Sequence, residues 1–110
     1  MLRIPLFTLA VLCAATLGVS MAALAAPVTN ADLQGKKICW SDGGTPTYGK
    51  NGAYDEPGFG HGTWSLTGGR LTVAANNGEY TGAITKDNGR FHISGRINGA
   101  VLDAWGKYCD

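Results

Sequence analysis

The sequence predicts an all-β domain: a small antiparallel meander of six to eight strands that closes into a barrel and carries one disulfide. Short segments rich in Val, Ile, Thr and aromatic residues follow one another from residue 63 onward, and glycine-containing turns separate them. Apolar and polar residues alternate along these segments, as in strands with one buried face. Two cysteines lie near the two ends of the domain, where they can join its first strand to its last. A two-sheet β-sandwich is the alternative fold.

The first 25 residues predict a secretory signal peptide. Arg3 precedes a long apolar run over residues 4–26, and Ala23-Leu24-Ala25 forms a small-x-small cleavage site. We therefore expect cleavage after Ala25 and a single domain over residues 26–110, secreted or periplasmic and free of the membrane. An uncleaved membrane anchor is the alternative, because the run is long enough to span a bilayer.

The strands of the mature domain are separated by recognisable turns. The first strand is "KKICW", which follows a single helical turn at "NADLQ"; "TPTY" and "GAY" are weaker strand candidates. Then come "TWSLT", "RLTVAA", "EYTGAIT", "RFHISGRI" and "AVLDAWGKYC". Asn98-Gly99 is the strongest hairpin signal, because a type I′ turn needs positive φ at both positions. Gly68-Gly69 predicts another two-residue turn, and "KDNG" a four-residue turn.

Alternation assigns the residues to two faces. The inner face takes Ile38, Trp40, Trp64, Leu66, Leu71, Val73, Tyr80, Ile84, Phe91, Ile93, Ile97, Leu102, Ala104 and Tyr108. Cys39 and Cys109 both fall on the outer face, as a disulfide between adjacent first and last strands requires. An even number of strands makes the closing seam antiparallel and an odd number makes it parallel. The first strand, in "QGKKICW", resembles the start of lipocalin-type and avidin-type barrels, which implies a barrel architecture and no functional residue.

The cysteines and the charges limit the classes of function. Cys13 lies in the predicted signal peptide, and the remaining pair, Cys39 and Cys109, reads as a disulfide in an exported domain of this size. Two cysteines lack the close spacing of a zinc-ligand pair, so we expect no metal and no cofactor. The mature domain has five Lys and three Arg against six Asp and two Glu, with no basic run. This balance argues against nucleic acid or an anionic membrane as a partner.

The glycine-rich segment over residues 41–62 is the first candidate site. It is the stretch least like a strand, with seven glycines and two prolines, and we expect a long irregular loop there. Its candidate ligand-binding residues are Tyr48, Tyr54, Asp55, Glu56, Phe59 and His61. Aromatic rings stack on the C–H faces of sugars, and carboxylates accept hydrogen bonds from hydroxyl groups. The alternative is a pair of glycine-rich hairpins whose aromatic residues cap the end of the barrel.

Trp105 is the second candidate, because it should face outward between Asp103 and Lys107, where a tryptophan can anchor a partner. Packing over the disulfide, or an inward turn at a bulge, is the alternative. The signals for catalysis are weak. Asp55 and Glu56 are the best carboxylate pair for a hydrolase, yet neighbours in an extended chain point apart.

The sequence therefore predicts an exported, monomeric, non-catalytic binding module. Its ligand is a small molecule or glycan held by the 41–62 loop and the mouth of the barrel. The alternative is a module that binds a secreted protein, such as an inhibitor of a secreted hydrolase or an interaction protein of the envelope.

Overall fold

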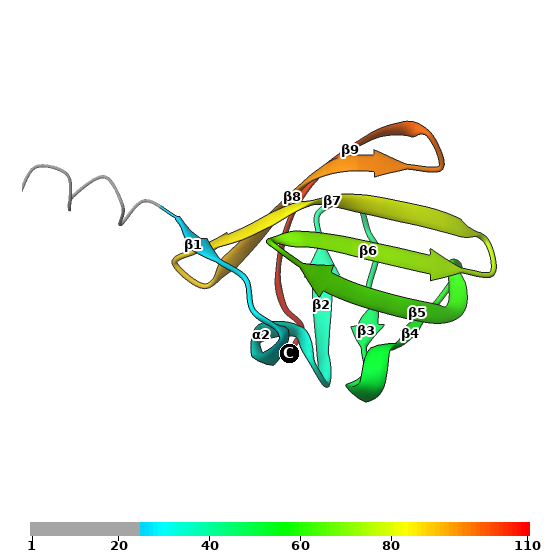
Figure 1. The fold of residues 1–110 in the computed structure, drawn as a ribbon, viewed down its shortest axis with the longest axis horizontal. Coiled ribbons are helices and arrows are strands. Elements are labelled where there is room, and N and C mark those ends of the chain that lie inside the picture. Colours follow the sequence, from blue (N-terminus) through cyan, green and yellow to red (C-terminus); the bar gives the residue numbers. More distant parts are fainter. Residues whose placement is uncertain (1–24) are drawn as a thin grey trace, which may run out of the picture.

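The computed structural model describes residues 25–110, so the predicted signal peptide lies outside the described residues except for Ala25. Eight strands form the barrel: β2 (Lys36–Trp40), β3 (Thr47–Tyr48), β4 (Ala53–Glu56), β5 (Gly60–Thr67), β6 (Arg70–Ala75), β7 (Gly78–Asp87), β8 (Arg90–Ile97) and β9 (Ala100–Tyr108). Three short elements accompany them: β1 (Ala26–Pro27), the helix α2 (Asn30–Leu33) and the 3-10 turn η1 (Lys50–Gly52). Figure 1 shows their arrangement.

The predicted meander barrel is confirmed. Each strand from β2 to β9 pairs antiparallel with the next, and β2 pairs antiparallel with β9, so the sheet closes on itself. The strand count is therefore even and the closing seam is antiparallel. The short strand β1 was not predicted; it pairs with the end of β7 at Lys86 and Thr85, beyond the last residue that β6 reaches. Closure leaves the barrel strands without the free edges that promote aggregation.

The alternation of faces is confirmed along most strands. Apart from Tyr108, the predicted inward residues form the core or, as with Leu66 and Ile97, pack partly buried against it; Leu71, Val73 and Ile38 are fully buried. Two glycines let neighbouring strands approach closely, because a Cβ at Gly62 would lie 1.9 Å from the Ala74 carbonyl oxygen and one at Gly95 2.0 Å from that of Thr81.

Tyr108 departs from the predicted pattern, because it is 41% exposed rather than inside the barrel. It lies at the end of β9, where its ring packs edge-on against Phe91 and beneath the Lys36 ammonium. The Tyr108 hydroxyl donates to the carbonyl of Asp32 at 2.8 Å. The side chain thus joins the last strand to α2 instead of filling the core.

The hairpin turns carry the backbone geometry that their residues favour. Asn98 and Gly99 have φ of 48° and 85°, which fits the predicted type I′ turn. Asn88 and Gly89 have φ of 52° and 79°, and Asp87 pairs with Arg90. The turn between β7 and β8 is therefore a two-residue turn, and the four-residue "KDNG" turn is a wrong prediction. Lys86 and Asp87 extend the strand, since two positive-φ residues complete the reversal by themselves.

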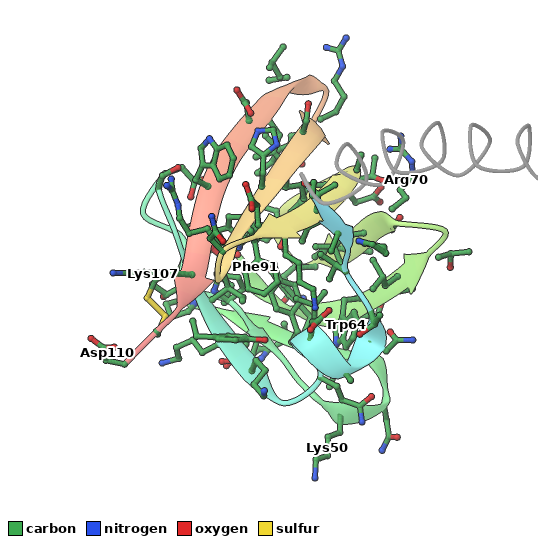
Figure 2. The ribbon with its side chains drawn as sticks, turned by 90° about the vertical axis from the view of Figure 1, so that its left-hand side faces the viewer. Lys50, Trp64, Arg70, Phe91, Lys107 and Asp110 are labelled. Carbon is green, nitrogen blue, oxygen red and sulfur yellow. A yellow bond between two sulfur atoms is a disulfide. The ribbon has the colours of Figure 1, made fainter. Side chains whose placement is uncertain are left out.

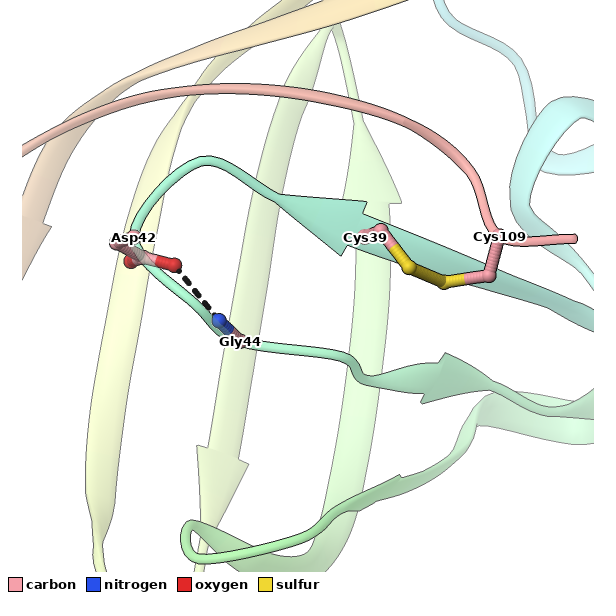
Figure 3. The surroundings of a disulfide bond; sticks show 4 residues. All are labelled: Cys39, Asp42, Gly44 and Cys109. Atoms are coloured by element: carbon pink, nitrogen blue, oxygen red, sulfur yellow. Dashed lines mark hydrogen bonds between the residues drawn. A yellow bond between two sulfur atoms is a disulfide. The ribbon is translucent and has the colours of Figure 1, made fainter.

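The disulfide joins Cys39 of β2 to Cys109, the residue after β9, with a Cα–Cα distance of 5.2 Å (Figure 3). The backbone N–H of Cys109 also donates to the carbonyl of Lys37 at 3.0 Å. The bridge lies across the closing seam, as predicted, and ties down the C-terminus.

One end of the barrel is covered by α2. Leu33 of this helix is fully buried in the core, and the Lys86 ammonium pairs with Asp32 at 2.9 Å. Trp64 lies beside α2 (Figure 2), and its indole N–H donates to the carbonyl of Gly49 at 2.9 Å. We call this the closed end. Within residues 25–110, no helix has the length and apolar character needed to cross a membrane.

Candidate ligand-binding site at the open end of the barrel

The end of the barrel opposite α2 is formed by four connections, at residues 41–46, 57–59, 76–77 and 98–99. A cavity of about 40 Å³ opens here, with room for roughly three water molecules. Its lining consists of Trp40, Asp42, Glu56, Phe59, Tyr80, Ile93, Ile97, Leu102 and Ala104. We call this site the mouth.

A chain of hydrogen bonds runs from the core to the mouth. The indole N–H of Trp40 donates to the Tyr48 hydroxyl at 3.2 Å, and the Tyr48 and Tyr80 hydroxyls lie 2.7 Å apart. The Tyr80 hydroxyl is also 3.1 Å from that of Tyr54, which donates to the carboxylate of Glu56. Burial raises the pKa of all three tyrosines well above the ordinary value, so they remain hydroxyl donors. The network thus fixes the Glu56 carboxylate from the core side of the mouth.

Glu56 contributes a carboxyl group with a raised pKa to the mouth. Tyr54 and Glu56 are two residues apart on β4 and share its inner face, so the half-buried carboxylate turns toward the cavity. Burial raises the pKa of Glu56 above its ordinary value, and the nearby charge of Asp42 raises it further, whereas the hydrogen bond from Tyr54 opposes the shift. Asp42 is held in the turn after β2, where its Oδ1 accepts the N–H of Gly44 at 3.0 Å (Figure 3).

Three aromatic side chains complete the lining. Trp40 ends β2 and Tyr80 lies near the start of β7, so both point inward at the open end. Phe59, in the turn between β4 and β5, packs against Tyr80 with ring centroids 5.9 Å apart. The mouth therefore combines apolar ring surface with two carboxylates, an arrangement suited to binding a small polar group attached to an apolar or sugar framework.

The structure divides the predicted residues of the 41–62 segment between two faces. Glu56 and Phe59 lie at the mouth, whereas Tyr48 and Tyr54 are 0% and 2% exposed and support it from within. Asp55 and His61 lie on the outer face, as cross-strand neighbours with Asp55 Oδ1 2.9 Å from His61 Nδ1. Asp55 and Glu56 therefore do not face a common space.

The prediction of a long irregular loop over residues 41–62 is wrong. Three strands occupy much of it, namely β3, β4 and the start of β5. The alternative of two glycine-rich hairpins, whose aromatic residues fill the end of the barrel, describes the segment. The weaker strand candidates "TPTY" and "GAY" correspond to β3 and β4. Six of the seven glycines lie in turns, at strand ends or between elements, and only Gly62 lies inside a strand.

Trp105 faces outward from β9, as predicted, and is 43% exposed. Its ring stacks on His92 with centroids 4.4 Å apart, and the Arg90 guanidinium lies 4.8 Å from the ring centre. Asp103 Oδ1 lies 2.5 Å from His92 Nε2. This cluster belongs to the outer face of β8 and β9 and is separate from the lining of the mouth.

Seven lining residues of the mouth were missing from the sequence-based candidates: Trp40, Asp42, Tyr80, Ile93, Ile97, Leu102 and Ala104. Trp40 and Tyr80 were assigned to the inner face. Their positions at strand ends next to turns could have indicated that they line an end of the barrel. Asp42 had no distinguishing signal beyond the turn-forming "DGG" that follows β2. Among residues 25–110, no three His, Cys, Asp or Glu side chains converge as a metal site requires.

Comparisons of the chain with protein-family models, with curated proteins and with solved structures found no match.

Proposed function

We propose that this protein is an exported, non-catalytic binding module that holds a small polar molecule, or the end of a glycan, in the mouth of its barrel. The observation that carries the proposal is the cavity at the end opposite α2, lined by three aromatic rings and two carboxylates. Polar groups converging on an apolar pocket are typical of small-ligand sites.

The size of the cavity limits what enters it. A volume of about 40 Å³ admits one small group and excludes a whole sugar ring. The rest of the ligand would lie across the rim formed by the surrounding turns, with Phe59 as the half-buried aromatic platform. The site would thus recognise a terminal group on a larger molecule.

The framework of the mouth is rigid, which favours binding. The disulfide fixes the seam beside Trp40, and the tyrosine network fixes the carboxylate of Glu56. A preorganised site loses less conformational entropy when its ligand binds. The disulfide also supports export, because such bridges persist in oxidising compartments.

Tryptophan fluorescence tests the proposal. Trp40 lines the mouth and Trp105 lies on the outer face, so Trp105→Phe removes the outer reporter and leaves the mouth intact. With glucose, glucosamine, N-acetylglucosamine and their disaccharides as probes, we expect a saturable signal change that survives Trp105→Phe and disappears in Trp40→Phe. A change that disappears in Trp105→Phe instead would place binding on the outer face and contradict the proposal.

A protein-binding module remains the second candidate, and the outer face of β9 favours it. Val101 and Trp105 share that face and are 75% and 43% exposed. Exposed aromatic residues on a rigid strand are common anchors at protein interfaces. A photo-crosslinker at position 105 would then capture a stoichiometric secreted partner, such as a hydrolase, and one at position 42 would not.

A further inference from the structure

We infer that the group held in the mouth is an ammonium group, so that the ligand is a small amine or an amino sugar with a free amine. This inference rests on the proposed function and specifies the chemistry of the ligand. It follows from the charges, the position and the aromatic surroundings of the two carboxylates in the mouth.

The carboxylates of the mouth have no cation from the described part of the chain. The three ion pairs found in residues 25–110 use Asp32, Asp55 and Asp103. The lining residues include Asp42 and Glu56 and, within the described chain, no Lys, Arg or His. A half-buried carboxylate beside a second one is destabilised by desolvation and by repulsion, and a bound cation relieves both.

The two carboxylates come together beside Gly44. A methyl carbon at Gly44 would lie 2.5 Å from Oε2 of Glu56 and 3.3 Å from Oδ1 of Asp42. Both oxygens therefore lie beside Gly44, close enough for one ammonium group at the mouth to donate to each. Tyr54 donates to Oε1 of Glu56, so Oε2 is the oxygen turned toward Gly44 and Asp42.

The rings of the mouth fit the same ligand. Trp40, Phe59 and Tyr80 line the cavity beside the carboxylates. Aromatic faces attract ammonium groups and pack against the carbon atoms that carry them. A neutral hydroxyl group would fit this site less well, because it carries no charge to offset the repulsion between the two carboxylates. An ammonium group has three hydrogen-bond donors and a positive charge. Both suit a site with two carboxylate acceptors and surrounding aromatic rings.

An NMR titration of the ¹⁵N-labelled protein tests the inference with two matched trisaccharides. The probes are the trisaccharide of glucosamine, which carries free amines, and its fully N-acetylated counterpart. We expect the amine form to shift the resonances of residues 41–46 and 57–59 and to bind at least tenfold more tightly than the acetylated form. Charge-assisted hydrogen bonds of the kind proposed account for a preference of this size.

Glu56→Gln should reduce the affinity for the amine form about tenfold or more, and Asp42→Asn, which keeps the acceptor for Gly44, should act in the same direction. Asp55→Asn is the control, since it removes the same charge from the adjacent residue on the outer face. Gly44→Ala tests the position of Oε2, because its methyl group would lie 2.5 Å from that oxygen and displace the Glu56 carboxylate without changing a charge. Retained dispersion of the spectra shows that each variant is folded.

The outcomes separate the inference from the proposed function. Equal binding of both trisaccharides at the mouth would overturn the ammonium inference and leave the proposed function standing. An amine preference that Asp55→Asn abolishes as strongly as Glu56→Gln would also overturn it, because a general charge effect would then explain the data. Shifts confined to the outer face around Trp105, or no shifts with either sugar, would contradict both.

Discussion

Removal of the disulfide should cost the domain a large share of its stability. The bridge joins residues that are 70 apart in the sequence, so it closes a loop over nearly the whole barrel. Loop-closure entropy assigns about 4 kcal/mol to a cross-link of this length. For a domain of this size that loss lowers the melting temperature by roughly 20 °C. Total stabilities of such domains are about 4–13 kcal/mol, so the unbridged barrel should be marginal.

The assay is urea unfolding of Cys39→Ala/Cys109→Ala beside the oxidised protein, followed by tryptophan fluorescence. We expect the midpoint to fall and the dependence on urea to steepen, because the unbridged unfolded chain exposes more surface. The wild-type protein in excess reductant is the control and should match the double variant. A loss of stability below about 1 kcal/mol would refute the reasoning, since the hydrogen bonds of the β2–β9 seam would then suffice to close the barrel.

Three further predictions concern the framework of the barrel. Gly99→Val should cost about 1–3 kcal/mol in a urea titration because it forces a φ of 85° on a β-branched residue; a cost equal to that of Gly99→Asn would contradict the turn geometry. Leu33→Ala should cost about 2–5 kcal/mol through the cavity left under α2, and an unchanged melting temperature would show that the helix does not seal the closed end. Burial raises the pKa of Asp32, but the backbone N–H of Thr29 and the Lys86 ammonium outweigh it and hold that pKa below its ordinary 3.8. The stability contributed by Asp32 is therefore present above pH 3.8 and lost as the pH falls through the lower pKa of the folded state. The free energy of unfolding, measured against pH, should fall less steeply with acid in Asp32→Asn. An identical pH dependence in the two proteins would contradict the role assigned to Asp32.

The barrel could be predicted from the sequence because its determinants are local. Alternation placed Trp40 and Cys39 on opposite faces, and Asn98-Gly99 specified its turn without reference to the rest of the chain. The pairing of first and last strands followed from the two cysteines, whose outward directions agreed. Closure was therefore deducible even though the number of strands was not.

The composition of the mouth could not be predicted, because it depends on which strand ends meet in space. Tyr80 and Glu56 are far apart in the sequence and share a cavity only through the register of β4 to β7. Conversely, Asp55 and Glu56 are adjacent but lie on opposite faces of the barrel wall. Glycine also made β3 and β4 only weak strand candidates, in "TPTY" and "GAY", since the low strand propensity of the glycines around them indicates a loop when the pairing partners are unknown.

Mapping the binding site with a library of small polar fragments shows whether ligands bind at the open end of the barrel. Sugars, amines and small acids would be added in turn to the ¹⁵N-labelled protein, and the shifted resonances located on the fold. We expect the shifts to cluster at residues 41–46, 57–59 and 97–100, around the mouth. Shifts that cluster instead on the outer face of β8 and β9, or around α2 at the closed end, would contradict binding at the mouth.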